Sequence, residues 1–166
     1  MATAILIPVS EYLESVYRPD CDYLEGELVE RNVGERDHSR GQTRIVGYLF
    51  NREAELGIHV YAEMRVQVRR DRYRVPDVCV VLGSEPDERV FTAPPFLCVE
   101  ILSPRDSMTS MQERIDDYFR FGVSFVWVID PRLKRAFIYS PGQMREATEA
   151  LSTANPEIRV PLSAIF

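Results

Sequence analysis

PFLCVEIL (95–102) and SFVWVID (124–130) are the two segments that decide how this chain folds. Each is a short and nearly continuous apolar run, which is typical of a strand buried on both faces of a sheet. The segment 105–121 between them is predicted to be a helix that ends at Gly122. One face of this helix carries Met108, Met111, Ile115, Tyr118 and Phe119. A helix between two buried strands indicates a crossover unit with parallel strands.

Further elements alternate on both sides of this unit. Helices are expected over 10–17, with Ser10 as N-cap, and over 36–56, with Gly57 as C-cap. The expected strands are 22–32, 59–70, 72–83, 135–140 and a short one near EIRVPL (157–162). The polar RRDR stretch at 69–72 is expected to close a hairpin. The order predicts an α/β (α+β) fold, a mixed β-sheet flanked by helices.

Length and composition indicate a single globular domain over residues 1–166, with its core over about 22–140. Apolar runs reach only about eight residues, far below the roughly 20 that span a bilayer. The N-terminal segment has no basic stretch, so we expect no signal peptide, no membrane partner and a cytoplasmic protein. Three cysteines without CxxC spacing argue against a disulfide framework or a zinc site.

The charge pattern is informative about partners. A net charge of −6 argues against a passive nucleic-acid binder, but it permits an enzyme with one local basic face. The predicted hairpin carries a candidate basic patch, Arg65, Arg69, Arg70, Arg72 and Arg74. Of these, Arg72 and Arg74 lead directly into Asp77, and we expect them to bind substrate. The alternative for the patch is a solvated hairpin without function.

Asp77 and Glu100 are the residues that point to chemistry. Asp77 follows Pro76 inside a strand-like run, and a proline there indicates a strand start, an edge or a bulge. Glu100 is a carboxylate in an apolar strand, where its burial has to be compensated. Two carboxylates on neighbouring strands, which lie about 4.8 Å apart, can share one divalent cation. The alternatives are turn chemistry for the aspartate and an arginine partner for the glutamate.

The segments YRVPDVCVV (73–81), PPFLCVEILSPRDS (94–107) and YFRFGVSFVWVIDP (118–131) resemble the Uma family, whose members are described as endonucleases. That family is assigned to the PD-(D/E)XK restriction-endonuclease-like superfamily. The segment YLEGELVE (23–30), followed by His38, is similar to the family's entry segment. The ordered set of segments over residues 22–140 is a more specific signal than the Pro-Asp dipeptide alone. The resemblance implies a restriction-endonuclease-like mixed sheet flanked by helices.

The resemblance also implies a site. Asp77 and Glu100 would be the ligands of a Mg²⁺ or Mn²⁺ ion, together with the backbone carbonyl of Ile101. Glu27 and His38 match positions of the family that would line the site as catalytic residues. The alternatives are a solvated strand residue for Glu27 and a surface or helix-entry histidine for His38.

One position departs from the superfamily pattern. The motif expects a lysine two residues after the acidic residue, where this chain has Leu102. The family resembled carries a lysine on the next helix instead, and here that place is Arg114, four residues before Tyr118. Arg114 is near the strand ends if the helix begins after Ser110, but about 15 Å along the axis if it begins after Ser103.

An arginine stays protonated, so Arg114 could stabilise charge on a phosphate but could not act as a general base. The alternative for Arg114 is a surface ion pair with Asp117 or Glu113. We do not expect Lys134, the only lysine, to reach the site.

These observations predict a Mg²⁺-dependent endonuclease that hydrolyses DNA phosphodiester bonds, acting as a homodimer. The missing lysine and the negative net charge favour an alternative, a catalytically impaired nucleic-acid-binding domain that keeps the nuclease fold. A third hypothesis is a dimeric interaction protein that associates through exposed aromatic residues, namely Tyr12, Tyr17, Phe91 and Phe96.

Overall fold

The computed structural model describes residues 5–31 and 35–166. Its helices are α1 (Val9–Glu14), α2 (Arg36–Phe50), α3 (Glu53–Leu56) and α4 (Met108–Phe121), with a 3-10 turn η1 (Leu162–Ala164) near the C-terminus. Its strands are β1 (Cys21–Leu24), β2 (Glu27–Glu30), β3 (Ile58–Ala62), β4 (Val66–Arg69), β5 (Arg72–Arg74), β6 (Val78–Leu82), β7 (Leu97–Ile101), β8 (Phe125–Asp130), β9 (Arg135–Ser140), β10 (Gln143–Ala147), β11 (Ala150–Ser152) and β12 (Arg159–Pro161). Within the described ranges, no helix is both long enough and apolar enough to cross a bilayer.

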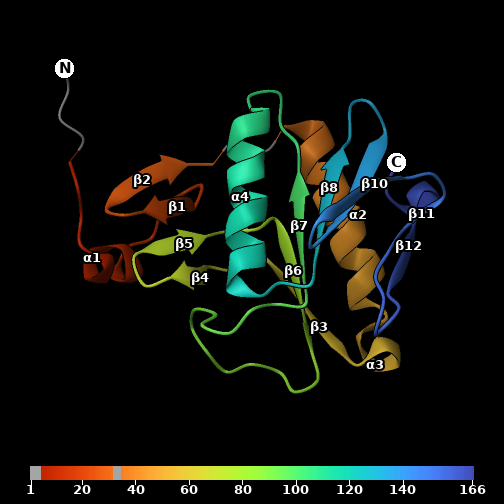
Figure 1. Ribbon diagram of the computed structural model, residues 1–166, viewed down its shortest axis with the longest axis horizontal. Helices are drawn as coiled ribbons and strands as arrows, with labels where there is room; N and C mark the ends of the chain where they lie inside the picture. Colours follow the sequence, from red (N-terminus) through yellow and green to blue (C-terminus); the bar gives the residue numbers. More distant parts are fainter. Residues whose placement is uncertain (1–4, 32–34) are drawn as a thin grey trace.

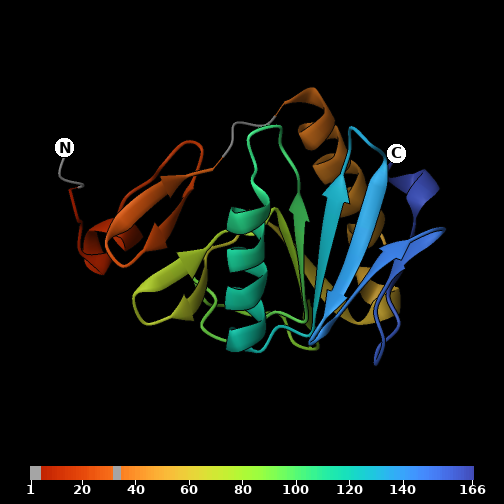
Figure 2. The same ribbon diagram turned by 45° about the horizontal axis from the view of Figure 1, so that its top comes forward.

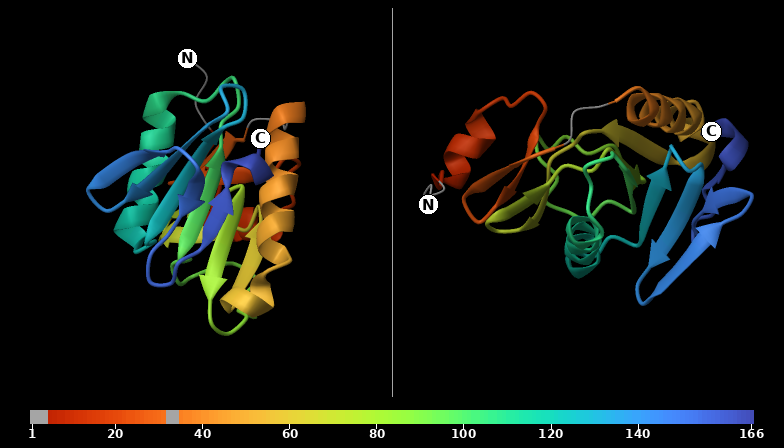
Figure 3. Two further views of the ribbon diagram at one scale, coloured as in Figure 1. Left: turned by 90° about the vertical axis from the view of Figure 1, so that its right-hand side faces the viewer. Right: turned by 90° about the horizontal axis from the view of Figure 1, so that it is seen from above.

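A mixed six-stranded sheet, in the order β10-β9-β8-β7-β6-β3, forms the centre of the molecule. Helices α2 and α4 cover its opposite faces (Figure 1; Figure 3, left). Strands β7 and β8 are parallel and joined through α4, with Val99 paired to Trp127. The predicted mixed sheet with flanking helices, and its parallel crossover unit, are therefore confirmed.

The alternation of side chains along β7 explains why both helices are held against the sheet. Leu97, Val99 and Ile101 point to the face that packs on α2. Cys98 points to the other face, where it packs with α4. By the same two-residue period, Glu100 belongs to the α4 face, so the strand places a carboxylate under that helix.

A second, four-stranded sheet in the order β2-β1-β5-β4 lies beside the central one, with α1 packed on it (Figure 2). Its core is an aromatic cluster in which the rings of Tyr12 and Tyr23 stack at 5.0 Å between centroids and Tyr73 packs against both. The residues 75–77 connect β5 of this sheet to β6 of the central sheet. Asp77 therefore lies where the two sheets meet.

Several predicted strands are divided in the structure. The strand expected over 22–32 is the hairpin β1–β2, which turns at Glu25 and Gly26 because both adopt positive φ. The expected strands 59–70 and 72–83 each contribute to both sheets: β3 pairs with β6 in the central sheet, and β4 pairs with β5 in the small one. Strands β10 and β11 were not predicted.

Helix boundaries follow local capping chemistry. Helix α4 begins after Ser107, not after Ser103 or Ser110, because the Ser107 hydroxyl accepts a 3.0 Å hydrogen bond from the Ser110 amide in a capping box. Gly122 ends α4 in the left-handed conformation, with φ of 114°, as predicted. The single helix expected over 36–56 is divided at Asn51 and Arg52 into α2 and α3, and Gly57, with φ of 64°, ends α3. Helix α1 begins at Val9, one residue before Ser10, the predicted N-cap.

The aromatic residues proposed as an association surface do not form one. Tyr12 is 0% exposed and Phe91 is 2% exposed, while Tyr17 and Phe96 are half-buried. The Tyr12 hydroxyl donates a 2.8 Å hydrogen bond to the carbonyl of Cys21, so this ring belongs to the core of the small sheet. The prediction of an exposed aromatic interface at these residues is wrong, because burial of the rings stabilises the fold itself.

The central sheet supplies a stability prediction. Ile129 in β8 is fully buried, so Ile129→Ala should lower the free energy of unfolding by about 2–5 kcal/mol through lost contacts and a residual cavity. Leu133→Ala, at an exposed position in the following turn, should have little effect. Urea unfolding followed by circular dichroism measures both, and equal changes in the two variants would contradict the assignment of β8 to the core.

Candidate active site

Asp77 and Glu100 lie opposite one another at the junction of the two sheets. In the antiparallel pair β6–β7, Val78 pairs with Val99 and Cys79 with Cys98. The pairing ends at Val78 and Val99, and the next residue along is Asp77 beside the one and Glu100 beside the other; both are 1% exposed. The sequence prediction that the two carboxylates come from adjoining strands thus agrees with the geometry.

The Asp77 carboxylate is held from several sides. Its Oδ1 forms an ion pair with Arg31, and its Oδ2 accepts a 2.7 Å hydrogen bond from the Ile101 amide. His38 at the start of α2 places its Nε2 3.3 Å from the same Oδ2. The backbone carbonyl of Asp77 accepts a 2.9 Å hydrogen bond from the Gln42 side chain. Helix α2, β7 and the segment after β2 therefore all meet at this residue.

The Glu100 carboxylate is compensated by α4. Arg114 donates to its Oε2 at 3.1 Å, and the Tyr118 hydroxyl donates to its Oε1 at 2.5 Å. Arg114 and Tyr118 are one helical turn apart, so they present both groups to the strand together. The helix begins after Ser107, which places Arg114 about 10 Å along its axis and directly over Glu100. Surface pairing of Arg114 with Asp117 or Glu113, the alternative interpretation, is not what the structure shows.

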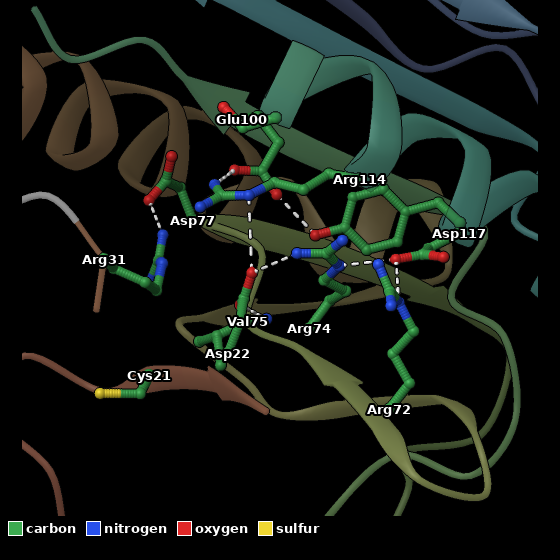
Figure 4. A network of polar contacts seen from close by, with 12 residues as sticks. Cys21, Asp22, Arg31, Arg72, Arg74, Val75, Asp77, Glu100, Arg114 and Asp117 are labelled. Carbon is green, nitrogen blue, oxygen red and sulfur yellow. Dashed lines mark hydrogen bonds and ion pairs between the residues drawn. The ribbon is translucent and has the colours of Figure 1, made fainter. Parts of the chain in front are cut away.

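Arg114 also connects Glu100 to a third buried carboxylate, Asp22 of β1. The Arg114 Nε lies 3.5 Å from the Asp22 Oδ2, which also accepts a 2.8 Å hydrogen bond from Arg74. The other Asp22 oxygen accepts from the Val75 amide at 2.9 Å. Figure 4 shows Arg114 between Glu100 and Asp22, with Arg31 reaching Asp77 separately. This network ties the small sheet to the central sheet.

Burial and neighbouring charges move the pKa values of the two carboxylates in opposite directions. Burial alone would raise the pKa of Asp77, but the hydrogen bond with His38 and the charge of Arg31 outweigh it and lower that pKa. Burial raises the pKa of Glu100 to about 7, opposed by Arg114 and reinforced by Asp77. For His38, burial would lower the pKa, but the contact with Asp77 raises it. Asp77 is therefore the more firmly ionised of the two carboxylates.

A small cavity of about 10 Å³ lies against this cluster and has room for one water molecule or one ion. Its lining consists of Arg31, His38, Asp77, Ile101, Ser103, Asp106 and Arg114. Within the described part of the chain, the Nε of Arg31 and the Nδ1 of His38 are buried without a hydrogen-bond partner. A small polar ligand in this cavity would satisfy such groups.

The donor set fits Mg²⁺ or Mn²⁺. Asp77, Glu100 and the Ile101 carbonyl offer hard oxygen atoms, and Mg²⁺ in proteins is held by one or two carboxylates while it keeps several waters. Among the described residues, no three His, Cys, Asp or Glu side chains lie close enough to form a complete metal cage. The set therefore suits an ion that is partly hydrated and shared with a substrate. Binding would require Arg31 and Arg114 to release part of the carboxylates.

The other predicted site residues divide into two groups. His38 lies in the cluster, and it is not the surface histidine of the alternative interpretation. Glu27 is exposed at the turn of the β1–β2 hairpin, outside the buried network. The hairpin residue that enters the network is Asp22. The predicted catalytic role of Glu27 therefore has no support from its position, which matches the solvated strand residue of the alternative.

The predicted substrate-binding role of Arg74 does not fit the structure either. Arg74 is 3% exposed, and its guanidinium donates to Asp22 and, at 2.7 Å, to Asp117. Arg72 donates to Asp117 at 2.7 Å and to Glu25, and its side chain is 16% exposed. Both arginines hold α4 and the hairpin against β5, because burying their charges requires carboxylate partners.

Sequence reasoning missed Asp22, Arg31 and Asp117. Asp22 carried a usable signal, since it is a carboxylate in the run CDYL, the same feature that singled out Glu100. Asp117 lies one residue before Tyr118 on the apolar side of α4, but a charged residue there looked like ordinary helix surface. Arg31 lies just after β2 in an irregular segment, and no periodicity marks it.

Comparison with known proteins identifies a matching family and a solved structure with the same fold. Residues 9–164 match the Uma2 family, which is described as "Putative restriction endonuclease". The crystal structure of a "putative nuclease belonging to DUF820" from Anabaena variabilis superposes with a TM-score of 0.81 at 23% identity, covering 96% of this chain and 97% of that one. At this identity the likeness shows the shared fold. No curated protein gave a significant match.

The Asp22 network predicts a large mutational effect. Asp22→Ala should lower the free energy of unfolding by about 3–5 kcal/mol, because it leaves Arg74 buried without one of its carboxylate partners. Glu25→Ala is the matched control in the same hairpin, since Glu25 also binds an arginine but is exposed. Denaturant unfolding compares the two variants. A small effect of Asp22→Ala would show that water reaches Arg74.

Proposed function

Because the chain belongs to the Uma2 family, we propose that it is a Mg²⁺- or Mn²⁺-dependent endonuclease that hydrolyses DNA phosphodiester bonds. The observation that carries this proposal is the pair of buried carboxylates on adjoining strands: Asp77 lines a small cavity with Arg31 and Arg114, and Arg114 also binds Glu100. Ion-binding oxygens and two guanidinium groups at one point suit a reaction centre that carries negative charge.

Different side chains would bind the metal ion, neutralise charge on the phosphate and orient the ligands. Asp77 and Glu100 would hold the metal ion with the Ile101 carbonyl. A divalent cation bound there would supply Lewis-acid charge to the phosphodiester and favour ionisation of a water molecule. Arg114 would neutralise charge that develops on the phosphate, since a guanidinium donates hydrogen bonds but does not accept a proton at neutral pH. His38 and the Ile101 amide orient the Asp77 carboxylate through its Oδ2.

We also propose an oligomeric state and a cellular location for the enzyme. A homodimer would present two such centres to the two strands of a duplex, one centre to each strand. We also propose that this enzyme acts in the cytoplasm.

A second function, a catalytically impaired nucleic-acid-binding domain, is favoured by one observation. Each carboxylate already has an arginine partner, Arg31 for Asp77 and Arg114 for Glu100, so the charges balance without a cation. The chain also has Leu102 where the superfamily motif has lysine. Metal binding and cleavage distinguish the two functions.

The proposed function predicts that the chain binds a divalent metal ion. Isothermal titration with Mn²⁺ should show one binding site per chain in the wild type, and Asp77→Asn or Glu100→Gln should weaken it at least about tenfold, because each removes a charged oxygen ligand. Arg31→Gln should strengthen Mn²⁺ binding, since it removes the cation that competes for Asp77. Unchanged affinity in all three variants would place the ion elsewhere.

The proposed function also predicts metal-dependent cleavage of DNA. With Mg²⁺ or Mn²⁺, Asp77→Asn and Glu100→Gln should slow the cutting of plasmid or single-stranded DNA by about a hundredfold or more. Arg114→Lys should retain part of the rate and Arg114→Met should lose it, because only the lysine keeps a positive charge. Glu113→Gln, at an exposed carboxylate on the same helix, is the control. A wild-type protein that binds metal but cuts neither DNA substrate would favour the impaired domain.

A further inference from the structure

A basic groove runs along the first turns of α2. Arg36, Arg40 and Arg44 are four residues apart and so share one face of the helix. Lys134, in the turn between β8 and β9, lies across from them, and all four line an open groove of about 770 Å³. The acidic side chain of the groove lining is Asp37. In a protein with a net charge of −6, this groove is a local concentration of positive charge.

The groove shares a wall with the candidate active site. His38 and Gln42, on the adjacent face of α2, contact Asp77. Gly41 lies between the two faces: it lines the groove, and a Cβ atom added to it would be 3.8 Å from the Ile101 side chain. Figure 1 shows the N-terminal end of α2 beside the C-terminal ends of β7 and β8. The groove and the cluster are thus separated by one helix width at most.

We propose that this groove binds the sugar-phosphate backbone of the DNA that enters the active site. This inference rests on the proposed nuclease function and adds the surface that positions its substrate. Guanidinium and ammonium groups in a row are the usual partners of consecutive phosphates. The N-terminus of α2 contributes further positive charge from the helix dipole, at the end where Arg36 and Arg40 lie.

Three of the four basic side chains of the groove are more accessible than Arg72 and Arg74, the hairpin arginines predicted to bind substrate. The Arg36 side chain is 93% exposed, and Arg40 and Lys134 are exposed as well. The contact of Arg36 with Asp37 at 3.2 Å is solvent-exposed and therefore weak. Arg72 and Arg74 of the hairpin, by contrast, are turned inward to Asp117. Substrate phosphates could therefore contact the arginines of α2, whereas Arg72 and Arg74 of β5 are occupied by Asp117.

Fluorescence anisotropy with labelled duplex and single-stranded oligonucleotides in EDTA tests the proposal without cleavage. The test variant is Arg36→Gln/Arg40→Gln/Lys134→Gln, which keeps Arg44 because its guanidinium donates to the Ile165 carbonyl at 3.0 Å. The control, Arg70→Gln/Arg120→Gln/Arg159→Gln, removes the same charge from exposed positions elsewhere. We expect the test variant to bind DNA at least about tenfold more weakly than wild type, whereas the control stays within about twofold of wild type. The slope of log affinity against log salt concentration should also become shallower in the test variant, by the amount that corresponds to about three lost phosphate contacts.

Other results would overturn the proposal. Equal binding by the test and control variants would show that the groove does not contact DNA, and failure of the wild type to bind either oligonucleotide at low salt would show the same. Binding of poly-glutamate but not DNA through the groove would assign it to an acidic protein. The nuclease function is judged separately by cleavage, since Asp77→Asn should abolish cutting while it leaves metal-free DNA binding intact.

Discussion

A carboxylate in the middle of a buried strand has to be compensated, and Glu100 imposes this requirement on the whole molecule. Arg114 and Tyr118 of α4 meet it directly. The guanidinium of Arg114 then needs further negative charge, which Asp22 of the small sheet supplies, and Asp22 in turn holds Arg74. One buried charge in β7 thus determines where α4 lies and how the small sheet docks. A protein built for stability alone would place an apolar residue there.

The sequence predicted the central part of this arrangement and missed its periphery. β7 and β8 were identifiable because strands buried on both faces are apolar throughout, and Asp77 and Glu100 stood out against them. The division of 59–83 between two sheets was not predictable, because the same alternation of apolar and polar residues suits a strand in either sheet. The run CDYL could have singled out Asp22 as a buried carboxylate, but its contact with Arg114, like that of Arg31 with Asp77, joins segments far apart in the chain, and no local pattern records such contacts.

The arginines of the cluster also explain how the site is stable before it meets a ligand. Asp77 and Glu100 would repel each other if both were ionised without partners, and burial would strengthen that repulsion. Arg31 and Arg114 remove this difficulty in the free protein. A cation that binds here would therefore have to displace guanidinium groups from the carboxylates. The displaced guanidinium groups would remain beside the cavity, where they could bind an anionic substrate.

Helix α2 carries both the side chains that contact Asp77 and the arginines of the basic groove. His38 and Gln42 contact Asp77, while Arg36 and Arg40 line the basic groove a fraction of a turn away. The two sets alternate along the helix, so an inserted or deleted residue between 38 and 40 would rotate Arg36 and His38 by about 100° relative to Arg40 and Gln42 and would break up both sets, since each residue advances an α-helix by that angle. This half of α2 can therefore change by substitution, but not by insertion or deletion.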